Sequence, residues 1–234
     1  MLRVYVPVYN EGERVIRNIG LIQDRLSRMG CDYQLIIVDD SSTDGSSKLV
    51  EELARENGRI IVKSYANGPS RRENLAQAML SSADDDMVCF IDADLSPDLA
   101  LLPELVHYVE SGYDIAIASR YMGIKPKRRM MRLLTSQAYN RIIQLVFSSK
   151  IRDHQCGFKA FKGRVVKSLI REAGYDSTLF RGWFWDAEIL IRAQKDNYRI
   201  MEFPSGWSEG SATSFNLRRE FRIVSYMLRF RMRV

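Results

Sequence analysis

Two aspartates, Asp92 and Asp94, follow directly after a short apolar run and are separated by one residue. The run, Val88 to Ile91, has the composition of a buried strand, so it would hold both carboxylates at its carboxyl end. Two carboxylates at this spacing can hold one hard divalent cation, while water and diphosphate oxygens complete its shell. We therefore expect Asp92 and Asp94 to bind Mg²⁺ or Mn²⁺, which would neutralise a diphosphate leaving group.

Polar and acidic residues also follow two other predicted strands. Asn10 and Glu11 come after the strand expected at 2–8, and Asp40 comes after the strand expected at 34–39. Ligands of open α/β sheets bind at the carboxyl ends of the strands, so we expect these side chains to meet the aspartate pair. Their mutual repulsion requires a cation or hydrogen-bond donors. Taken singly, each motif could instead be a turn with a helix N-cap.

The elements that position these residues alternate between short apolar runs and segments of helical periodicity. The expected strands are 2–8, 34–39, 60–64, 87–91, 114–119 and 198–203, and the expected helices are 11–29, 46–57, 70–83, 99–110, 133–148, 185–196 and a tail from 217. This alternation predicts right-handed βαβ units. We expect one α/β domain over residues 1–234, Rossmann-like, with a mostly parallel central sheet.

The net charge of +6 is unevenly distributed along the chain. Residues 125–132 carry five basic residues and no acid, and residues 216–234 carry six arginines and one glutamate. The rest of the chain holds 24 basic and 28 acidic residues. Both basic segments also contain large apolar residues, which favours a membrane surface or a phosphate ligand over nucleic acid. Solvated helix faces are the alternative interpretation.

The expected location is cytoplasmic, peripheral at the cytoplasmic face of a membrane. The three cysteines are widely spaced and form no CxxC pair, which favours a reducing compartment over a disulfide framework or zinc site. The first residues are too polar for a signal peptide. No run of about 18 apolar residues is long enough to span a bilayer.

Four motifs, in this order and spacing, resemble those of the inverting family 2 glycosyltransferases of the A-type fold: PVYNE (7–11), VDDSSTDG (38–45), DAD (92–94) and SRY (119–121). Three more segments resemble the dolichyl-phosphate β-glucosyltransferases: DHQCGFKAF (153–161), WFWDAEIL (183–190) and WSEGS (207–211). Related polyprenyl-phosphate sugar synthases share the first four motifs. The resemblance covers nearly the whole chain. It implies a nucleotide-diphospho-sugar transferase fold. The pattern along the chain, regular in its first part and less regular afterwards, indicates a nucleotide-sugar-binding half (1–120) and an acceptor half (121–234).

The resemblance implies a role for each matching position. The nucleotide sugar would contact Pro7, Tyr9, Asn10, Glu11, Val38, Asp40, Asp92, Ala93 and Asp94. The catalytic residues would be Asp92, Asp94, Arg120 and Asp186, with the metal on Asp92 and Asp94 and with Glu188 near the reacting sugar. We expect Arg120, Arg128, Arg129 and Arg218 at the acceptor phosphate, since guanidinium groups suit phosphate.

The chain departs from the family pattern at two places near this site. Glu73 stands where many relatives have an arginine, so Arg71 or Arg72 would have to supply an expected donor contact. Ser96 stands where some relatives have a glutamine that binds the metal. It could bind weakly, act through water, or not touch the metal.

The expected reaction is inverting transfer of a hexose, with glucose from UDP-glucose favoured, to dolichyl or another polyprenyl phosphate. A phosphate monoester is largely ionised at neutral pH, so this acceptor needs positioning rather than a strong general base. One alternative is a mannose synthase that uses GDP-mannose. Another is a sugar hydroxyl acceptor, which requires a general base, Asp186 before Asp153. A basic nucleic-acid-binding protein is disfavoured, because acids clustered at one edge do not help it bind phosphates.

Overall fold

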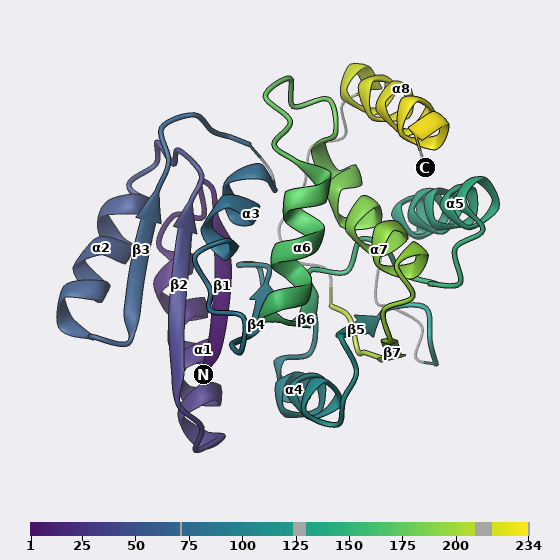
Figure 1. Ribbon diagram of the computed structural model, residues 1–234. Coiled ribbons are helices and arrows are strands. Elements are labelled where there is room, and N and C mark those ends of the chain that lie inside the picture. The colour runs from purple at the N-terminus through teal and green to yellow at the C-terminus, as the bar shows by residue number, and fades with distance from the viewer. Residues whose placement is uncertain (71, 124–129, 209–216, 234) are drawn as a thin grey trace.

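The protein is built around one seven-stranded sheet with the strand order β3-β2-β1-β4-β6-β5-β7 (Figure 1). The structure, a computed structural model, describes residues 1–70, 72–123, 130–208 and 217–233, with only the backbone of 217–222. The strands are β1 (Leu2–Val8), β2 (Tyr33–Asp39), β3 (Ile60–Ser64), β4 (Met87–Ile91), β5 (Ile115–Ser119), β6 (Phe158–Lys162) and β7 (Ile200–Pro204).

All strands except β6 run in the same direction. β1 is parallel to β2 and β4, β2 to β3, and β5 to β7, whereas β6 is antiparallel to both β4 and β5. The expected α/β fold with a mostly parallel sheet is confirmed. This arrangement brings the carboxyl ends of β1, β2, β4 and β5 to one edge of the sheet, together with the amino end of β6.

Helices cover the sheet and extend beyond its β7 side (Figure 1). They are α1 (Arg14–Arg28), α2 (Ser46–Glu56), α3 (Glu73–Met79), α4 (Leu102–Glu110), α5 (Met130–Phe147), α6 (Gly163–Ala173), α7 (Trp185–Lys195) and α8 (Leu217–Arg233), with short 3₁₀ turns at Leu99–Leu101 and Gly182–Phe184. Helix α6 contacts both α3 and α7. None of the helices in the described ranges is long and apolar enough to cross a membrane.

Two apolar clusters form the interior. The main cluster joins the sheet to its covering helices, including the buried α1 stripe Val15, Ile19, Ile22 and Leu26 that its periodicity predicts. The second cluster holds α5, α7 and α8 together through Ile143, Phe184, Ala187, Ile191, Ile223, Met227 and Phe230. The basic C-terminal helix is therefore packed against the domain along one side.

Most expected elements are present, and their ends differ from the expected ones by a few residues. The helix expected at 70–83 is wrong in extent, because α3 covers only Glu73–Met79. The backbone N–H of Ser70 donates to Asp40 instead, and the Ser70 hydroxyl accepts from the N–H of Asn74. β6 and α6 were not expected. β6 lies between β4 and β5, so residues from beyond position 120 complete the sheet.

Candidate active site

The aspartate pair lies at the carboxyl end of β4, as expected. Ser96 donates from its backbone N–H and its hydroxyl to the two carboxylate oxygens of Asp94, at 3.0 and 2.8 Å. The Asn18 side chain donates to the backbone carbonyl of Ala93 at 2.7 Å. These bonds fix the turn that follows the strand. Ser96 therefore orients Asp94 in this structure.

The edge carries an excess of negative charge. Burial raises the pKa of both Glu11 and Asp94 above its ordinary value, and the nearby carboxylate of Asp92 raises it further. For Asp94 the Ser96 bonds oppose this shift. A bound cation would relieve the same repulsion.

The donor set fits a hard divalent cation held by few protein ligands. In the described ranges, His, Cys, Asp and Glu side chains form no group of three or more that could hold a metal. Two carboxylates suit Mg²⁺ or Mn²⁺ when diphosphate and water oxygens complete the coordination shell, so Asp92 and Asp94 are the residues that would hold such an ion.

Asp92 is confined from two sides. The Nη1 of Arg72 donates to its Oδ1 at 2.9 Å. On the other side, a Cβ added at Gly157 would lie only 1.7 Å from Oδ2, and the backbone N–H of Asp92 donates to the Gly157 carbonyl at 2.9 Å. Only glycine at position 157 leaves room for this carboxylate.

A buried ion-pair chain extends from Asp92 into the domain. The Nε of Arg72 donates to Asp186 Oδ2 at 2.9 Å, and the Nζ of Lys159 donates to Asp186 Oδ1 at 2.8 Å. The Arg72 guanidinium also lies over the rings of Phe90 and Trp183, at 5.0 and 5.1 Å from their centroids. Both carboxylate oxygens of Asp186 are thus occupied by cations.

This environment makes Asp186 a weak base. Burial opposes ionisation, but the charges of Arg72 and Lys159 hold the pKa of Asp186 below its ordinary value. Asp153 is similar, since burial is outweighed by the Arg120 charge and its pKa is lowered. Neither carboxylate expected as a base for a hydroxyl acceptor is exposed, at 2% and 0% relative accessibility.

The other residues expected at the nucleotide lie along the same edge. Pro7 and Val38 are register partners in β1 and β2, and Tyr9 is exposed beyond β1. Asn10 accepts from the backbone N–H of Thr43 at 2.8 Å.

Asp40 is buried and holds the loop before α3. Its carboxylate accepts from the N–H and hydroxyl of Ser70, and from Asn74 at 2.6 Å. Its role in this structure is to place that loop beside the sheet edge.

Arg120 does not present its guanidinium at the surface. It is 3% exposed and forms a two-pronged pair with Asp153, with Nε–Oδ2 at 2.6 Å and Nη2–Oδ1 at 2.5 Å. Its guanidinium lies 4.8 Å from the Trp207 ring centroid. This placement differs from an open phosphate contact, because the arginine already has a buried carboxylate partner.

The remaining expected acceptor cations fall outside the described part of the chain. Arg128 and Arg129 belong to the range 124–129, and the side chain of Arg218 is not described. Next to Tyr121, however, a groove of about 690 Å³ is lined on α5 and the following loop by Arg141, Lys150 and Arg152. This groove is a basic surface that the sequence analysis did not identify.

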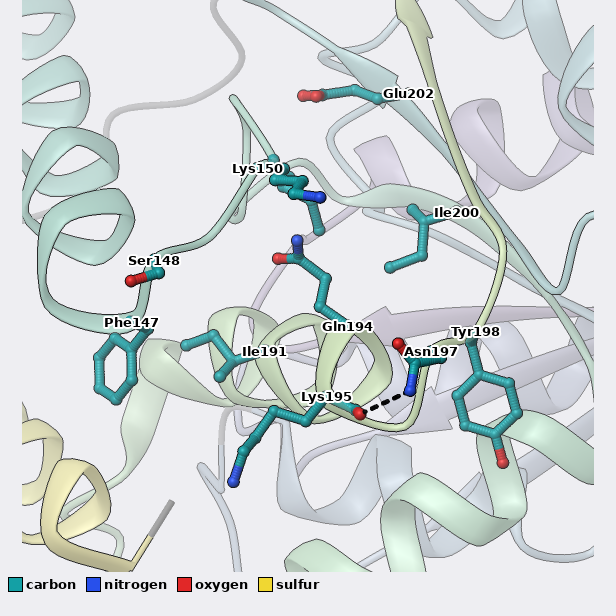
Figure 2. A pocket seen from close by; sticks show the side chains of 11 residues that line it. Phe147, Ser148, Lys150, Ile191, Gln194, Lys195, Asn197, Tyr198, Ile200 and Glu202 are labelled. Carbon is teal, nitrogen blue, oxygen red and sulfur yellow. Dashed lines mark hydrogen bonds between the residues drawn. The ribbon is translucent and has the colours of Figure 1, made fainter.

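A second hollow, of about 500 Å³, lies between the carboxyl ends of α5 and α7 and strand β7 (Figure 2). Lys150 and Gln194 project into it, with Glu202 on its β7 side (Figure 2). None of the expected site residues lines it. The expected nucleotide and metal residues lie instead at the carboxyl edge of the sheet, which we take as the candidate active site.

Gly157 and Lys159 were not expected as site residues, although both lie in the quoted segment 153–161. Lys159 lies between the apolar residues Phe158 and Ala160 in β6, and a charge in a buried strand requires a partner. That signal could have identified Lys159, but not Asp186 as its partner.

The chain is similar to known proteins in sequence and in fold. The sequence profile described as "Glycosyl transferase family 2" matches residues 3–170. Glycosyltransferase AglD of Haloferax volcanii is 34% identical over 93% of this chain and 34% of its own length. The undecaprenyl-phosphate 4-deoxy-4-formamido-L-arabinose transferase of Enterobacter sp. (strain 638) is 28% identical over 71% of this chain and 50% of its own length. The chain thus spans between a third and a half of these relatives.

Solved structures share the fold at low sequence identity. Glucosyl-3-phosphoglycerate synthase from Mycobacterium tuberculosis, in complex with Mn²⁺, UDP-glucose and phosphoglyceric acid, has a TM-score of 0.65 at 17% identity, covering 98% of this chain and 79% of that one. The mannosyltransferase PcManGT from Pyrobaculum calidifontis, in complex with GDP-Man and Mn²⁺, has a TM-score of 0.59 at 17% identity, covering 97% and 61%.

Proposed function

The chain belongs to glycosyl transferase family 2, and on that premise we propose that it transfers a hexose from a nucleotide sugar to the phosphate of a polyprenyl or dolichyl phosphate. The observation that carries this choice of acceptor is the state of Asp186 and Asp153. Both carboxylates are buried in ion pairs that lower their pKa, so neither suits general-base catalysis on a hydroxyl. A phosphate nucleophile needs no such base.

The relatives support the same acceptor class. The name of the undecaprenyl-phosphate arabinose transferase states a polyprenyl phosphate substrate. The basic groove formed by Arg141, Lys150 and Arg152 offers the cations that a phosphate approaching from the β5 side would need. Arg120 would contribute indirectly, because it binds Asp153 and so fixes the loop that contains Asp153.

We infer that the donor is UDP-glucose, bound along the edge formed by Pro7, Tyr9, Asn10, Glu11, Val38, Asp40, Asp92, Ala93 and Asp94. The solved neighbour that contains UDP-glucose supports this assignment. The neighbour that contains GDP-Man keeps GDP-mannose as the alternative donor. Asp92 and Asp94 would hold Mg²⁺ or Mn²⁺, which supplies charge neutralisation at the departing diphosphate when bound.

The main contribution of the chain's own residues would be to position the two aspartates and the two reactants. Asp94 is fixed by Ser96, and Asp92 is fixed by Arg72 and Gly157. In-line attack by an acceptor phosphate on an α-linked sugar would invert the anomeric centre. Holding the two reactants in that geometry supplies much of the rate enhancement expected of such a site.

We also infer attachment to the surface of a membrane, where a polyprenyl phosphate would reside. Helices α5 and α8 carry large exposed apolar side chains: Met130, Met131, Leu134, Ile142, Leu145, Val224, Leu228 and Met232. Apolar side chains interspersed with arginines are typical of helices that lie in the membrane interface.

A transfer assay tests the donor assignment. The protein would be incubated with a polyprenyl phosphate in detergent, Mn²⁺ and one labelled donor at a time: UDP-glucose, UDP-N-acetylglucosamine or GDP-mannose. We expect label in the lipid fraction from UDP-glucose, and loss of that label on chelation. If only GDP-mannose gives label, the donor is GDP-mannose and not UDP-glucose. Transfer that continues after chelation would contradict the proposed dependence on a divalent cation.

A further inference from the structure

Two consecutive residues, Arg72 and Glu73, form ion pairs with the first turn of α7 and with the segment just before it. Arg72 pairs with Asp186, and Glu73 pairs with Arg181 through Nε–Oε1 at 2.8 Å and Nη2–Oε2 at 2.6 Å. We call these four residues the charge clamp. It joins the start of α3, next to the nucleotide edge, to the start of α7.

The charge clamp is buried throughout: the relative exposures of Arg72, Glu73, Arg181 and Asp186 are 4%, 2%, 0% and 2%. Buried ion pairs are poor stabilisers, because desolvation offsets their attraction, and apolar residues often serve as well. Stability alone therefore does not explain why four charged side chains are buried between α3 and α7. The Glu73 half continues from Arg181 to Glu188 within α7, at 3.5 Å, whereas the Arg72 half continues to Asp92 at the sheet edge. The Arg72 half therefore offers a reason connected with the expected metal site.

We propose that Arg72 is a positioning residue that holds Asp92 ready for the divalent cation, and that Asp186 acts on Asp92 through Arg72. This inference rests on the proposed metal-dependent function. The guanidinium uses Nη1 for Asp92 and Nε for Asp186, so one planar group links both carboxylates. The rings of Phe90 and Trp183 fix its plane. A lysine carries the same charge but cannot form this fork.

Charge and position predict opposite effects of Arg72 on metal affinity. As a positive charge beside a metal-binding carboxylate, Arg72 repels the cation, so its removal would tighten binding. As the group that orients Asp92, it favours binding, because partners that orient a ligand contribute about 10- to 100-fold in metal affinity. Arg72→Lys keeps the charge and removes the fork, so it tests position alone.

The test is an isothermal titration calorimetry experiment in which Mn²⁺ is titrated into the full chain in the presence of UDP. For Arg72→Lys we expect Mn²⁺ affinity to fall at least about 10-fold, while UDP affinity measured in EDTA stays at the wild-type value. Unchanged Mn²⁺ affinity would overturn the proposal. An equal fall of UDP affinity in EDTA would also overturn it, since Arg72 would then act on the nucleotide directly.

A second pair of measurements tests the action of Asp186 through Arg72. We expect Asp186→Asn to weaken Mn²⁺ binding in the wild-type background, and to have no further effect when Arg72 is already glutamine. Additive losses in the double variant would contradict the linkage. The double variant Arg72→Gln/Asp186→Asn removes one positive and one negative charge, so its net charge equals that of the wild type. If Arg72→Lys does not fold, a loss of Mn²⁺ affinity in this double variant tests the positioning of Asp92 instead.

Glu73→Gln is the matched control. It breaks the other half of the charge clamp at the same helix end and does not touch Asp92. We expect a lower melting temperature with unchanged Mn²⁺ affinity, whereas a comparable loss of Mn²⁺ affinity would reduce Arg72 to a structural role. If wild type itself binds no Mn²⁺ with UDP, the metal-dependent function fails together with this inference.

Discussion

At the scale of single residues, the candidate site depends on how closely Asp92 is held. One of its carboxylate oxygens accepts from Arg72, and the other lies against Gly157. The DxD spacing predicts that Asp92 faces the sheet edge, because it follows β4. It cannot predict the contacts with Arg72 and Gly157, which come from segments 20 residues before and 65 residues after it.

We predict that Gly157→Ala reduces sugar transfer by about 100-fold, because the added Cβ would displace the Asp92 carboxylate from its position. Initial rates at saturating donor would measure this loss. The matched control is Gly20→Ala in α1, where an added Cβ meets no atom within 4 Å. Full activity in the Gly157→Ala variant would show that the position of Asp92 does not matter.

His154 makes stability depend on pH. Burial lowers its pKa from 6.5 to about 4, although Asp153 opposes the shift. Between these two values the unfolded chain binds a proton that the native protein does not, so stability falls as pH falls through this range. The loss amounts to about 3 kcal/mol of unfolding free energy by pH 4.

Urea unfolding at pH 7, 5.5 and 4.5 would measure this dependence. We predict that His154→Asn, which keeps a donor for Asn140 but no group that titrates in this range, has a shallower slope than wild type. Parallel slopes for the two proteins would contradict the assignment.

At the scale of elements, most of the sheet can be predicted from sequence. The strands β1 to β5 are apolar runs followed by polar turns, so their ends and the residues placed there could be located. β6 could not be located, because the five residues Phe158–Lys162 contain two lysines and do not read as a buried strand. The tertiary partners of Lys159 and Lys162 make that strand possible.

The charge clamp also lies beyond prediction from sequence. Arg72 could be named as a candidate near the donor, but its partner is 114 residues away in the chain. Nothing in the spacing of charges indicates that Arg72 turns inward while its neighbour Glu73 pairs with Arg181 instead. Such pairings follow from the packing of α3 against the second half of the domain.

Phe230 is one of the α8 side chains that pack this helix against the domain. The Phe230 ring lies 5.6 Å from Phe184 and 5.5 Å from Phe147, measured between centroids. We predict that Phe230→Ala lowers the unfolding free energy by about 3 kcal/mol. Leu228→Ala, on the exposed side of the same helix, should cost less than about 0.5 kcal/mol. Equal costs in denaturant titrations without lipid would show that α8 is not packed as described.

At the scale of the whole molecule, positive charge and exposed large apolar side chains are concentrated in the second half of the chain. The exposed apolar residues of α5 and α8 flank the same apolar cluster, and both helices belong to segments rich in arginine. These two helices are therefore the surface through which the proposed membrane attachment would occur.

Flotation with vesicles of phosphatidylglycerol and phosphatidylcholine measures this binding. We predict that wild type floats at low salt and that the double variant Leu134→Glu/Leu145→Glu on α5 does not. Leu21→Glu, at an exposed leucine of α1, should float as wild type does. If the α5 variant floats equally well, α5 is not the binding surface.

The central claim is that the acceptor is a phosphate, and that neither Asp186 nor Asp153 activates it as a general base. The most direct measurement compares a polyprenyl phosphate with the corresponding polyprenol as acceptor, at equal concentration, in the same detergent and with the same labelled donor. The account predicts transfer to the phosphate alone, with an inverted anomeric centre in the product. Transfer to the polyprenol at a comparable rate would contradict it, because a hydroxyl acceptor requires the general base that Asp186 and Asp153 do not provide.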